Sequence, residues 1–368
     1  MSATLDDGHQ VDEQPAMRAA VYHGAGDVRI DAVPCPGAPA PGQLLLAPTR
    51  VGVCGTDASE CAHGPIMIPL QHRHPGSGYL GPMVIGHEIA GRVLAVGENT
   101  SGFAVGDRVV TGGSVWCGEC ERCRQGRTNL CVTHYVHGLH APGGLAEQVV
   151  IEAASCVKVP DGCSDENAAL AQPFAVALHG LSRVGLQPGQ SVAVIGVGSI
   201  GAFALEGARA SGAEPLIAID RSKDRLSCAA ALGASAVVDS GECDAAEAVC
   251  GLTGGVGADV VVEASGQPQG LETATRATRL GGTVLLLGIQ ANPVPFDFKE
   301  LVLREVSIVT SVGSINKDDM PRAIEILGER DLASILVSDV VALEHIVEQA
   351  LEPMIHGSVA GKLLIAID

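Results

Sequence analysis

Residues 191–201 read Ser191-Val-Ala-Val-Ile-Gly196-Val-Gly198-Ser-Ile-Gly201, an apolar run that leads into the pattern G-x-G-x-x-G. The apolar run predicts a buried strand, and the residues from 200 to 210 predict a helix directly after it. Asp220 follows Gly201 by nineteen residues, at the end of the next predicted strand, 216–219. A strand, a glycine-rich turn, a helix and a later acidic residue form the context that a dinucleotide-binding turn requires.

Strand-like and helix-like segments continue to alternate after this turn. A helix is predicted over 223–232, and strands over 260–263 and 283–287 with the run LETATRATRL between them. Short, wholly apolar strands interleaved with helices are typical of a parallel sheet that is covered on both faces. The second half of the chain is therefore predicted to be a doubly wound α/β domain.

The residues before 170 have a different texture. Short β-rich runs such as LLLAPTRVGVC (44–54), MVIGHEIAGRVLAV (83–96) and DRVVT (107–111) are broken by Gly and Pro. They predict a coiled, partly barrel-like β domain. The run KLLIAI (362–367), which follows a predicted helical stretch over 345–351, is expected to be a strand that returns to this first domain.

Each position of the glycine turn has a physical role in nucleotide binding. Gly196 permits the tight turn, Gly198 lets the backbone approach a pyrophosphate, and Gly201 lets helix and strand pack closely, while Val197, Ser199 and Ile200 complete the turn. The helix N-terminus would face the phosphates. Asp220 can accept hydrogen bonds from ribose hydroxyls and would repel a 2′-phosphate, which favours NAD over NADP. The neighbouring Arg221 could instead accept that phosphate, and a glycine-rich turn without a nucleotide is the remaining alternative.

A cluster of four cysteines lies within the first part of the chain. They have the spacing C-x2-C-x2-C-x7-C and are Cys117, Cys120, Cys123 and Cys131. Four thiolates can surround one tetrahedral zinc and leave no open coordination position, which is typical of a structural site. A pair of disulfides and an iron–sulfur cluster are the alternatives.

The composition excludes several functional classes. A formal net charge of −19 repels nucleic acid and anionic membrane surfaces, and the 368 residues contain no apolar run long enough to span a bilayer. Residues 1–16 are acidic and polar and are expected to be a disordered tail rather than a signal peptide. The chain is expected to act in the cytoplasm and to form two domains. Its many glycines and an exposed edge strand expected in the second domain would suit a homodimer or homotetramer.

A second metal constellation precedes the cysteine cluster. Cys54 follows an apolar run and His87-Glu88 lies further on, so a thiolate, an imidazole and a carboxylate are available for zinc. The motifs G-x-C-G-T-D (52–57), G-H-E-x-x-G (86–91), G-D-R-V (106–109), the four cysteines, G-G-L-A-E (143–147) and G-V-G-S-I-G occur in that order. From Met17 to the C-terminus, the chain resembles the zinc-dependent medium-chain alcohol dehydrogenases. The runs GPIMIP (64–69) and PMVIGHE (82–88) are most similar to the butanediol and polyol (sorbitol) dehydrogenase branch.

This resemblance implies a fold and a reaction. It implies a GroES-like catalytic domain over 17–170 and 315–368 and an inserted Rossmann domain over 171–314. It implies two zinc ions, one of them catalytic and held by Cys54 and His87, with Glu88 as a ligand or alternate ligand and Asp57 orienting the histidine. The implied reaction is hydride transfer between NAD(H) and a secondary alcohol, vicinal diol, polyol or sugar, or the matching ketone.

Two positions depart from the family pattern. Gln172 stands where polyol dehydrogenases have Glu and ordinary alcohol dehydrogenases have Cys, and a neutral amide would leave more positive charge on the metal. Thr56 is the expected first group of a proton relay, but Ser59 stands where relatives have the histidine that continues it. These departures leave open threonine-type or aldose dehydrogenase activity, and also a non-catalytic NAD-binding scaffold whose zinc site has decayed.

Five other polar residues are candidates for particular roles. Histidines 63, 72 and 74 lie between the two ligand motifs and are either substrate contacts or solvated loop residues. His179 is expected to pack on the helix that links the domains. Lys362 is a candidate for contact with a cofactor phosphate across the domain cleft.

Overall fold

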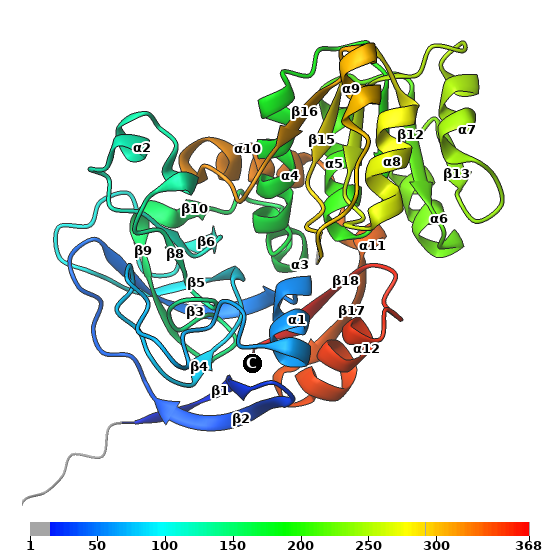
Figure 1. Ribbon diagram of the computed structural model, residues 1–368. Helices are drawn as coiled ribbons and strands as arrows, with labels where there is room; N and C mark the ends of the chain where they lie inside the picture. The colour runs from blue at the N-terminus through cyan, green and yellow to red at the C-terminus, as the bar shows by residue number, and fades with distance from the viewer. Residues whose placement is uncertain (1–14, 291, 368) are drawn as a thin grey trace, which may run out of the picture.

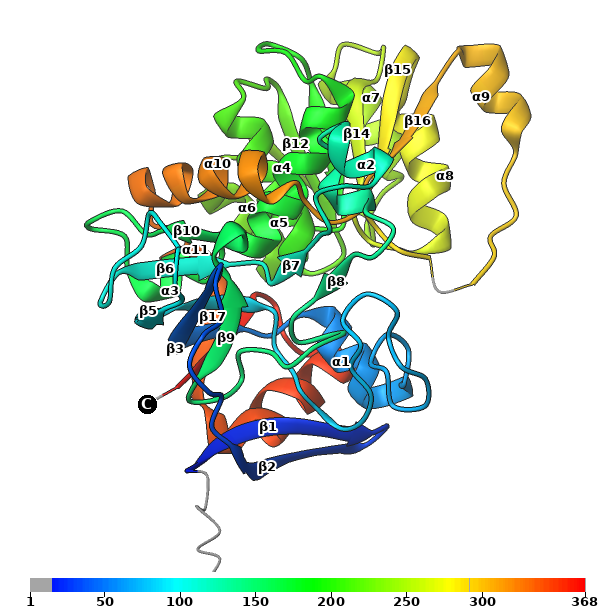
Figure 2. The ribbon, with the colours of Figure 1, turned by 90° about the vertical axis from the view of Figure 1, so that its left-hand side faces the viewer.

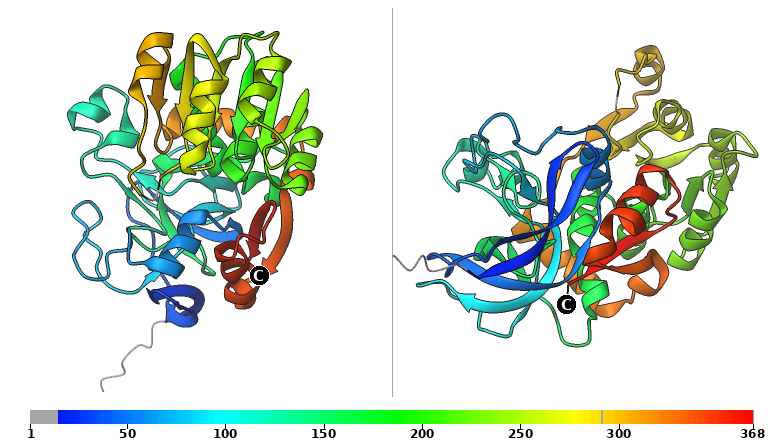
Figure 3. Two further views of the ribbon diagram at one scale, coloured as in Figure 1. Left: turned by 45° about the vertical axis from the view of Figure 1, so that its right-hand side comes forward. Right: turned by 90° about the horizontal axis from the view of Figure 1, so that it is seen from below.

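A computed structural model describes residues 15–290 and 292–367 (Figure 1). The tail expected over residues 1–16 lies outside the described residues except for Pro15 and Ala16, and Ala16 already begins strand β1, Ala16–Gly24. The chain forms a mixed α/β structure in which a β-rich part and a helix-covered sheet lie one above the other (Figures 1 and 3). Within the described residues, no helix is long and apolar enough to cross a membrane.

The helix-covered part is built on a parallel sheet of six strands in the order β13-β12-β11-β14-β15-β16. In chain order the strands are β11 (Val192–Ile195), β12 (Leu216–Asp220), β13 (Ala236–Asp239), β14 (Ala258–Glu263), β15 (Thr278–Leu286) and β16 (Ser307–Thr310). Every neighbouring pair is parallel. The strand order reverses beside β11, the strand that precedes the glycine turn, as in a Rossmann sheet.

Helices cover both faces of this sheet because successive strand side chains point to opposite sides. Val192 and Val194 pack with Phe203 on one face, whereas Ala193 and Ile195 pack with Val249 on the other. The first face carries α4 (Ala171–Val184), α5 (Ser199–Ala210) and α6 (Lys223–Leu232), with α10 (Asn316–Glu329) packed on α4, and the second carries α7 (Ala245–Leu252) and α8 (Pro268–Ala277). The doubly wound fold predicted from the alternating segments is confirmed.

The β-rich part contains a three-stranded and a seven-stranded antiparallel-dominated sheet. The first has the order β2-β1-β4, and the second has the order β10-β6-β5-β3-β18-β17 with β9 also paired to β3. The strands are β2 (Asp27–Pro34), β3 (Gln43–Gly52), β4 (Met83–Val84), β5 (Glu88–Val96), β6 (Arg108–Thr111), β9 (Val149–Glu152), β10 (Cys156–Lys158), β17 (Val337–Ala342) and β18 (Lys362–Ala366). Alternate residues such as Leu44, Leu46, Ile89 and Ile151 fill the GroES-like core between the sheets.

The C-terminal segment returns to this part, as the sequence predicts. Strand β18 pairs antiparallel with β3 and parallel with β17, and Figure 3 shows it in red beside the blue N-terminal strands. The helix expected over 345–351 is irregular instead: a 3-10 turn (Leu343–His345) and a π-helical turn (Val347–Leu351) precede α12 (Glu352–Ile355).

The remaining elements are short. They are α1 (Gly55–His63), β7 (Ser114–Val115), α2 (Glu121–Arg124), the 3-10 turn η1 (Thr128–Leu130), β8 (Tyr135–Val136), the 3-10 turn η2 (Ala153–Ser155), α3 (Asp165–Ala168), α9 (Phe298–Arg304) and α11 (Ala333–Leu336). Helix α2 and η1 form a small lobe that projects from the β-rich part toward α4 (Figures 1 and 2).

Candidate active site and metal centres

The pairing of two antiparallel strands assembles the first donor cluster. Gly52, the last residue of β3, lies opposite Glu88, the first residue of β5. Cys54 comes two residues after β3 ends and His87 comes directly before β5 begins, so the register brings both side chains to one edge of the sheet. The sulfur of Cys54, a ring nitrogen of His87 and a carboxylate oxygen of Glu88 all lie within 4.8 Å of one another. The absence of a side chain at Gly52 leaves room for the Glu88 carboxylate, since a Cβ there would lie 2.0 Å from Glu88 Oε2.

Asp57 holds this cluster from the first turn of α1. Its Oδ2 accepts the backbone N–H of Cys54 at 2.9 Å, and its Oδ1 lies 3.6 Å from His87 Nδ1, too far for a hydrogen bond. Asp57 Oδ1 and His87 Nδ1 are both buried, and neither has a hydrogen-bond partner among the described residues. Burial alone would lower the pKa of His87, but the charges of Asp57 and Cys54 outweigh it and the net shift is strongly upward.

These features fit a zinc ion. A thiolate and an imidazole converge with a carboxylate, and the negative charges around His87 are not yet balanced within the cluster. Because Nδ1 faces Asp57, Nε2 is the nitrogen of His87 that remains for a metal. A carboxylate behind a metal-bound histidine is a recurrent arrangement that fixes the ring orientation.

Glu88 has a second partner that the sequence did not reveal. Lys362 Nζ lies 2.6 Å from Glu88 Oε1 and 2.5 Å from Oε2, and the two side chains are 3% and 0% exposed. The interpretation of Lys362 as a contact for a cofactor phosphate is therefore wrong in this structure: the ammonium is buried against a carboxylate. The pair forms because Lys362 begins β18, which lies on the other side of β3 from β5.

The other candidate residues lie at different distances from the cluster. Thr56 is half-buried on α1, with Oγ1 3.6 Å from the sulfur of Cys54. Ser59 is exposed on the same helix. Gln172 is half-buried in the first turn of α4, and a Cβ on Gly112 would lie 2.8 Å from its Cγ. Gly112 directly follows β6, whose last residue, Thr111, pairs with Ile89 of β5. Gln172 therefore packs at the end of β6, the strand next to the one that Glu88 begins.

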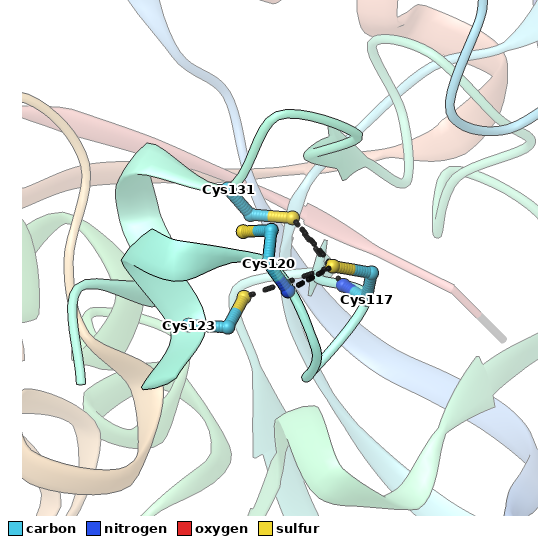
Figure 4. Close-up of side chains that lie close together, drawn as sticks. All are labelled: Cys117, Cys120, Cys123 and Cys131. Carbon is cyan, nitrogen blue, oxygen red and sulfur yellow. Dashed lines mark hydrogen bonds between the residues drawn. The ribbon is translucent and has the colours of Figure 1, made fainter. Parts of the chain in front are cut away.

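The four cysteines of the lobe converge as the spacing predicts (Figure 4). Their sulfur atoms all lie within 4.8 Å of one another, and Cys117 Sγ lies 3.6 Å from Cys131 Sγ and 4.0 Å from Cys123 Sγ. A disulfide requires about 2.05 Å between sulfurs. All four cysteines are free thiols, so the disulfide alternative is excluded in this structure.

The electrostatics of the lobe also call for a cation. Backbone N–H groups of Cys123 and Val132 lower the pKa of Cys120 to about 6, which favours its thiolate. Burial and the neighbouring Cys120 raise the pKa of Cys123 to about 12. Four sulfurs this close cannot all ionise unless a metal ion compensates the charge, and the cage fits a structural zinc with every position filled by protein.

The glycine turn opens a cleft of about 1120 Å³ along the carboxyl edge of the parallel sheet. Gly196 has a φ of +82°, and a Cβ there would lie 2.7 Å from Ser265. A Cβ on Gly201 would lie 1.9 Å from the carbonyl oxygen of Gly196, so this helix–strand contact permits only glycine. A Cβ on Gly198 would meet only Arg225, at 4.0 Å, so its backbone is open to the cleft at the start of α5.

Asp220 lies in the cleft wall and shapes the turn. Its Oδ2 accepts the N–H of Val197 at 2.8 Å, and its Oδ1 accepts the N–H groups of Arg221 and Ser222 at 2.8 and 2.9 Å. The Arg221 side chain is exposed at the cleft. Sequence reasoning missed Arg225, whose guanidinium lies 3.9 Å from Asp220 and donates to the carbonyl of Val359 at 3.2 Å. Arg225 lies in α6, five residues after Asp220, and no motif in the sequence indicated that it would contact the cleft.

The structure separates the remaining histidines. His63 is exposed at the last residue of α1, and His72 is an exposed loop residue. His74 stacks on His140 with ring centroids 4.4 Å apart. His179 packs on α4 as expected: its Nδ1 lies 3.1 Å from Asp319 Oδ2 and its Nε2 lies 3.3 Å from Asn129 Nδ2.

A GroES-like β part with a thiolate–imidazole–carboxylate cluster, joined to a Rossmann sheet with a nucleotide turn, defines an oxidoreductase that acts on CH–OH groups with zinc and a nicotinamide cofactor. Family models agree: residues 40–161 match the alcohol dehydrogenase GroES-like domain, and residues 199–329 match the zinc-binding dehydrogenase family. The chain belongs to the zinc-dependent medium-chain alcohol dehydrogenases, in the butanediol and polyol branch.

Three similar proteins illustrate this membership. A sorbitol dehydrogenase of Bacillus subtilis is 33% identical over 333 residues, which are 89% of this chain and 91% of that protein. An L-threonine 3-dehydrogenase of Pectobacterium carotovorum is 36% identical over 270 residues, 72% and 75% of the two chains. The crystal structure of 2R,3R-butanediol dehydrogenase from Bacillus subtilis superposes with a TM-score of 0.88 at 30% identity and covers 96% of this chain and 100% of that one.

Proposed function

We propose that this protein is an NAD(H)-dependent dehydrogenase of vicinal diols, polyols or related secondary alcohols, sugars included, or a reductase of the matching ketones. The observation that carries the proposal is the Cys54, His87 and Glu88 cluster, braced by Asp57 in a buried setting. The relatives named for sorbitol and butanediol support the substrate class. The threonine-type alternative has support from the relative named for L-threonine.

The residues present would divide the work as follows. When bound, a zinc ion would polarise the substrate oxygen and a nicotinamide would accept the hydride. Cys54 and His87 would hold the metal, with Glu88 and Gln172 as further candidate ligands. Asp57 would keep the His87 ring in orientation, and the Thr56 hydroxyl, beside Cys54, would take up the substrate proton. The exposed Ser59 cannot act as a base near neutral pH, so solvent would complete the relay.

We assign NAD rather than NADP as the preferred cofactor on the charge of the cleft wall. Three backbone N–H groups already occupy about three of the four acceptor positions of Asp220, which leaves room for one ribose hydroxyl. The carboxylate would repel a 2′-phosphate, while Arg221 would attract it. The nucleotide would contact residues 196–201, that is Gly196, Val197, Gly198, Ser199, Ile200 and Gly201.

The domain division and the assembly belong to the same proposal. We place the catalytic domain over 17–170 and 315–368 and the nucleotide domain over 171–314. We further propose a homodimer, or a homotetramer built from such dimers, through α9 and the edge strand β16. Helix α9 has no buried residue although it carries Phe298, Val302 and Leu303, and an apolar helix beside an unpaired strand edge suits a second copy.

A substrate screen on purified protein tests the function. NAD reduction is measured with vicinal diols, polyols, aldoses, bulky secondary alcohols and L-threonine, then repeated with NADP, and bound zinc is counted by mass spectrometry. Two zinc ions per chain and turnover of diols or polyols are expected. One zinc ion, confined to the cysteine lobe, with no turnover of any class would favour a non-catalytic NAD-binding scaffold.

A further inference from the structure

The segment 311–315 follows β16 at the carboxyl edge of the parallel sheet, the edge that also carries the glycine turn. A dinucleotide on a doubly wound sheet lies along this edge, with one nucleotide on each side of the switch point. Asp220 ends β12, so the adenosine half lies over β12. The strand order β12-β11-β14-β15-β16 then places the nicotinamide half toward β16. The segment therefore borders the nicotinamide end, a step that rests on the proposed function.

Two side chains from outside the segment, Asn129 and Asp319, bond to it directly, and Arg183 bonds to Thr310, the strand residue just before it. Arg183 Nε donates to the carbonyl of Thr310 at 2.7 Å, and Asn129 Nδ2 donates to the carbonyl of Val312 at 2.9 Å. Asp319 Oδ2 accepts the N–H of Ile315 at 2.6 Å. His179, on α4, connects the last two contacts through Asp319 and Asn129.

The hydrogen bonds of this network are consistent with one assignment of protons. The amide group of Asn129 has two N–H donors, one for Val312 and one for His179 Nε2. His179 must then carry its proton on Nδ1, where it donates to Asp319. His179 and Asp319 are both buried, so the bond between them is shielded from competing water, whereas the bond from Asn129 to Val312 lies at the exposed end of the network. The reverse orientation of the Asn129 amide would set its oxygen against the Val312 carbonyl.

Asn129 depends in turn on the cysteine lobe. It lies in η1, Thr128–Leu130, between the third and fourth cysteines, Cys123 and Cys131. Figure 2 shows the lobe in front of the chain that runs from β16 to α10. A metal cage that closes this loop therefore also places the Asn129 amide.

We infer that Asn129 is a positioning residue through which the cysteine lobe holds the segment 311–315 against the nicotinamide half of the cofactor. The four sulfurs of the lobe leave no coordination position for a substrate. The lobe instead supports cofactor binding, because its Asn129 fixes the segment 311–315. This effect concerns only one half of the dinucleotide, because the network has no residue in the cleft wall around Asp220.

The test compares NADH with ADP-ribose, which has the same adenosine diphosphate but no nicotinamide. Dissociation constants of the holoprotein for both probes are measured by calorimetry for the parent, Asn129→Ala and Asn129→Asp, with zinc content and melting temperature. Asn129→Asp keeps the shape but sets a carboxylate against the Val312 carbonyl, and it serves if the alanine variant folds poorly. The control, Arg122→Ala, changes an exposed side chain of the same lobe that contacts Gln125.

Both Asn129 variants are expected to bind NADH more weakly, by up to roughly tenfold, the upper range for one net hydrogen bond, with ADP-ribose affinity and two zinc ions retained. Arg122→Ala should match the parent. Equal weakening of both probes, or no weakening of either, would overturn the inference. A parent that binds neither probe would instead refute the proposed function and remove the basis of this inference with it.

Discussion

Gln172, proposed as a further zinc ligand, stands where the polyol dehydrogenase pattern has Glu. A carboxylate there would neutralise more of the metal charge than an amide oxygen does, so a group polarised by the metal would lose its proton less readily. Gln172→Glu should therefore retain at least as much zinc as the parent and shift the acidic limb of the kcat profile to higher pH. Metal analysis and a pH–rate series measure both effects.

A matched control separates the ligand role from a change in net charge. Gln349→Glu adds the same charge at an exposed position and should leave the zinc content and the pH profile unchanged. If Gln172→Glu also behaved like the parent in both respects, Gln172 would not be a zinc ligand.

In the proposed nucleotide site, Arg221 is the residue expected to bind the 2′-phosphate of NADP. Its side chain is exposed at the cleft, and no hydrogen bond or ion pair of its guanidinium is seen among residues 15–290 and 292–367, whereas Arg225 already donates to the Val359 carbonyl. Arg221→Ala should weaken NADP binding roughly tenfold, the range for one charge-assisted hydrogen bond, and leave NAD binding unchanged. Calorimetric titration with both cofactors tests this, with the exposed Arg124→Ala as control. Equal losses for both cofactors would show that Arg221 does not recognise the 2′-phosphate.

At this scale the sequence predicts donor atoms better than their partners. Cys54, His87 and the four lobe cysteines were found because metal donors have few residue types and restricted spacing. The partner of Lys362 was not predictable, since Glu88 lies 274 positions away and meets it only through the β5-β3-β18 pairing. The role of Asn129 was not predictable either, because its acceptor is the backbone carbonyl of Val312, and a backbone group leaves no mark in the sequence.

The contact between β5 and β18 carries a stability prediction. Lys362→Met would leave the buried Glu88 carboxylate without its cation, and breaking a buried ion pair in this way costs about 3–5 kcal/mol. The double variant Glu88→Gln, Lys362→Met should recover much of this loss because no charge remains buried. Urea unfolding of the zinc-loaded protein measures both values. A single and a double variant of equal stability would mean that the pair does not carry the effect.

Element prediction succeeded where a segment's own pattern decides its structure. The helix predicted over 223–232 coincides with α6, which Ser222 begins by accepting the N–H of Arg225 and Gly233 ends in the left-handed region. Strand β15 begins five residues before the predicted 283, because Thr278 pairs with Ala258 ahead of a register shift. Strands β13 and β16 were missed: each is four residues long, and tertiary pairing defines it.

At the scale of the whole molecule, the two metal clusters differ in what surrounds them. The lobe cysteines sit on a projecting loop and connect to the nucleotide part through Asn129 and His179. The Cys54 cluster lies at a strand end in the β-rich part, and Gln172, at the start of α4, packs against Gly112 next to the β5–β6 pair. Both clusters therefore stand where the two parts of the chain meet, which is where substrate and cofactor have to be brought together.

The assembly proposed for α9 and β16 is the feature of the whole molecule that is most directly testable. Phe298, Val302 and Leu303 are 67%, 73% and 67% exposed, and a single chain gains nothing by displaying three large apolar side chains on a seven-residue helix. Val302→Asp combined with Leu303→Asp would place two charges in a desolvated contact, so the dimer should dissociate into folded monomers. Size-exclusion chromatography coupled to light scattering gives the mass. Zinc content and circular dichroism establish that the monomers are folded. Val105→Asp, a change at a similarly exposed valine in the β-rich part, should keep the mass of the parent. A parent that is monomeric at micromolar concentration, or a double variant with the parent's mass, would place the subunit contact elsewhere or exclude it.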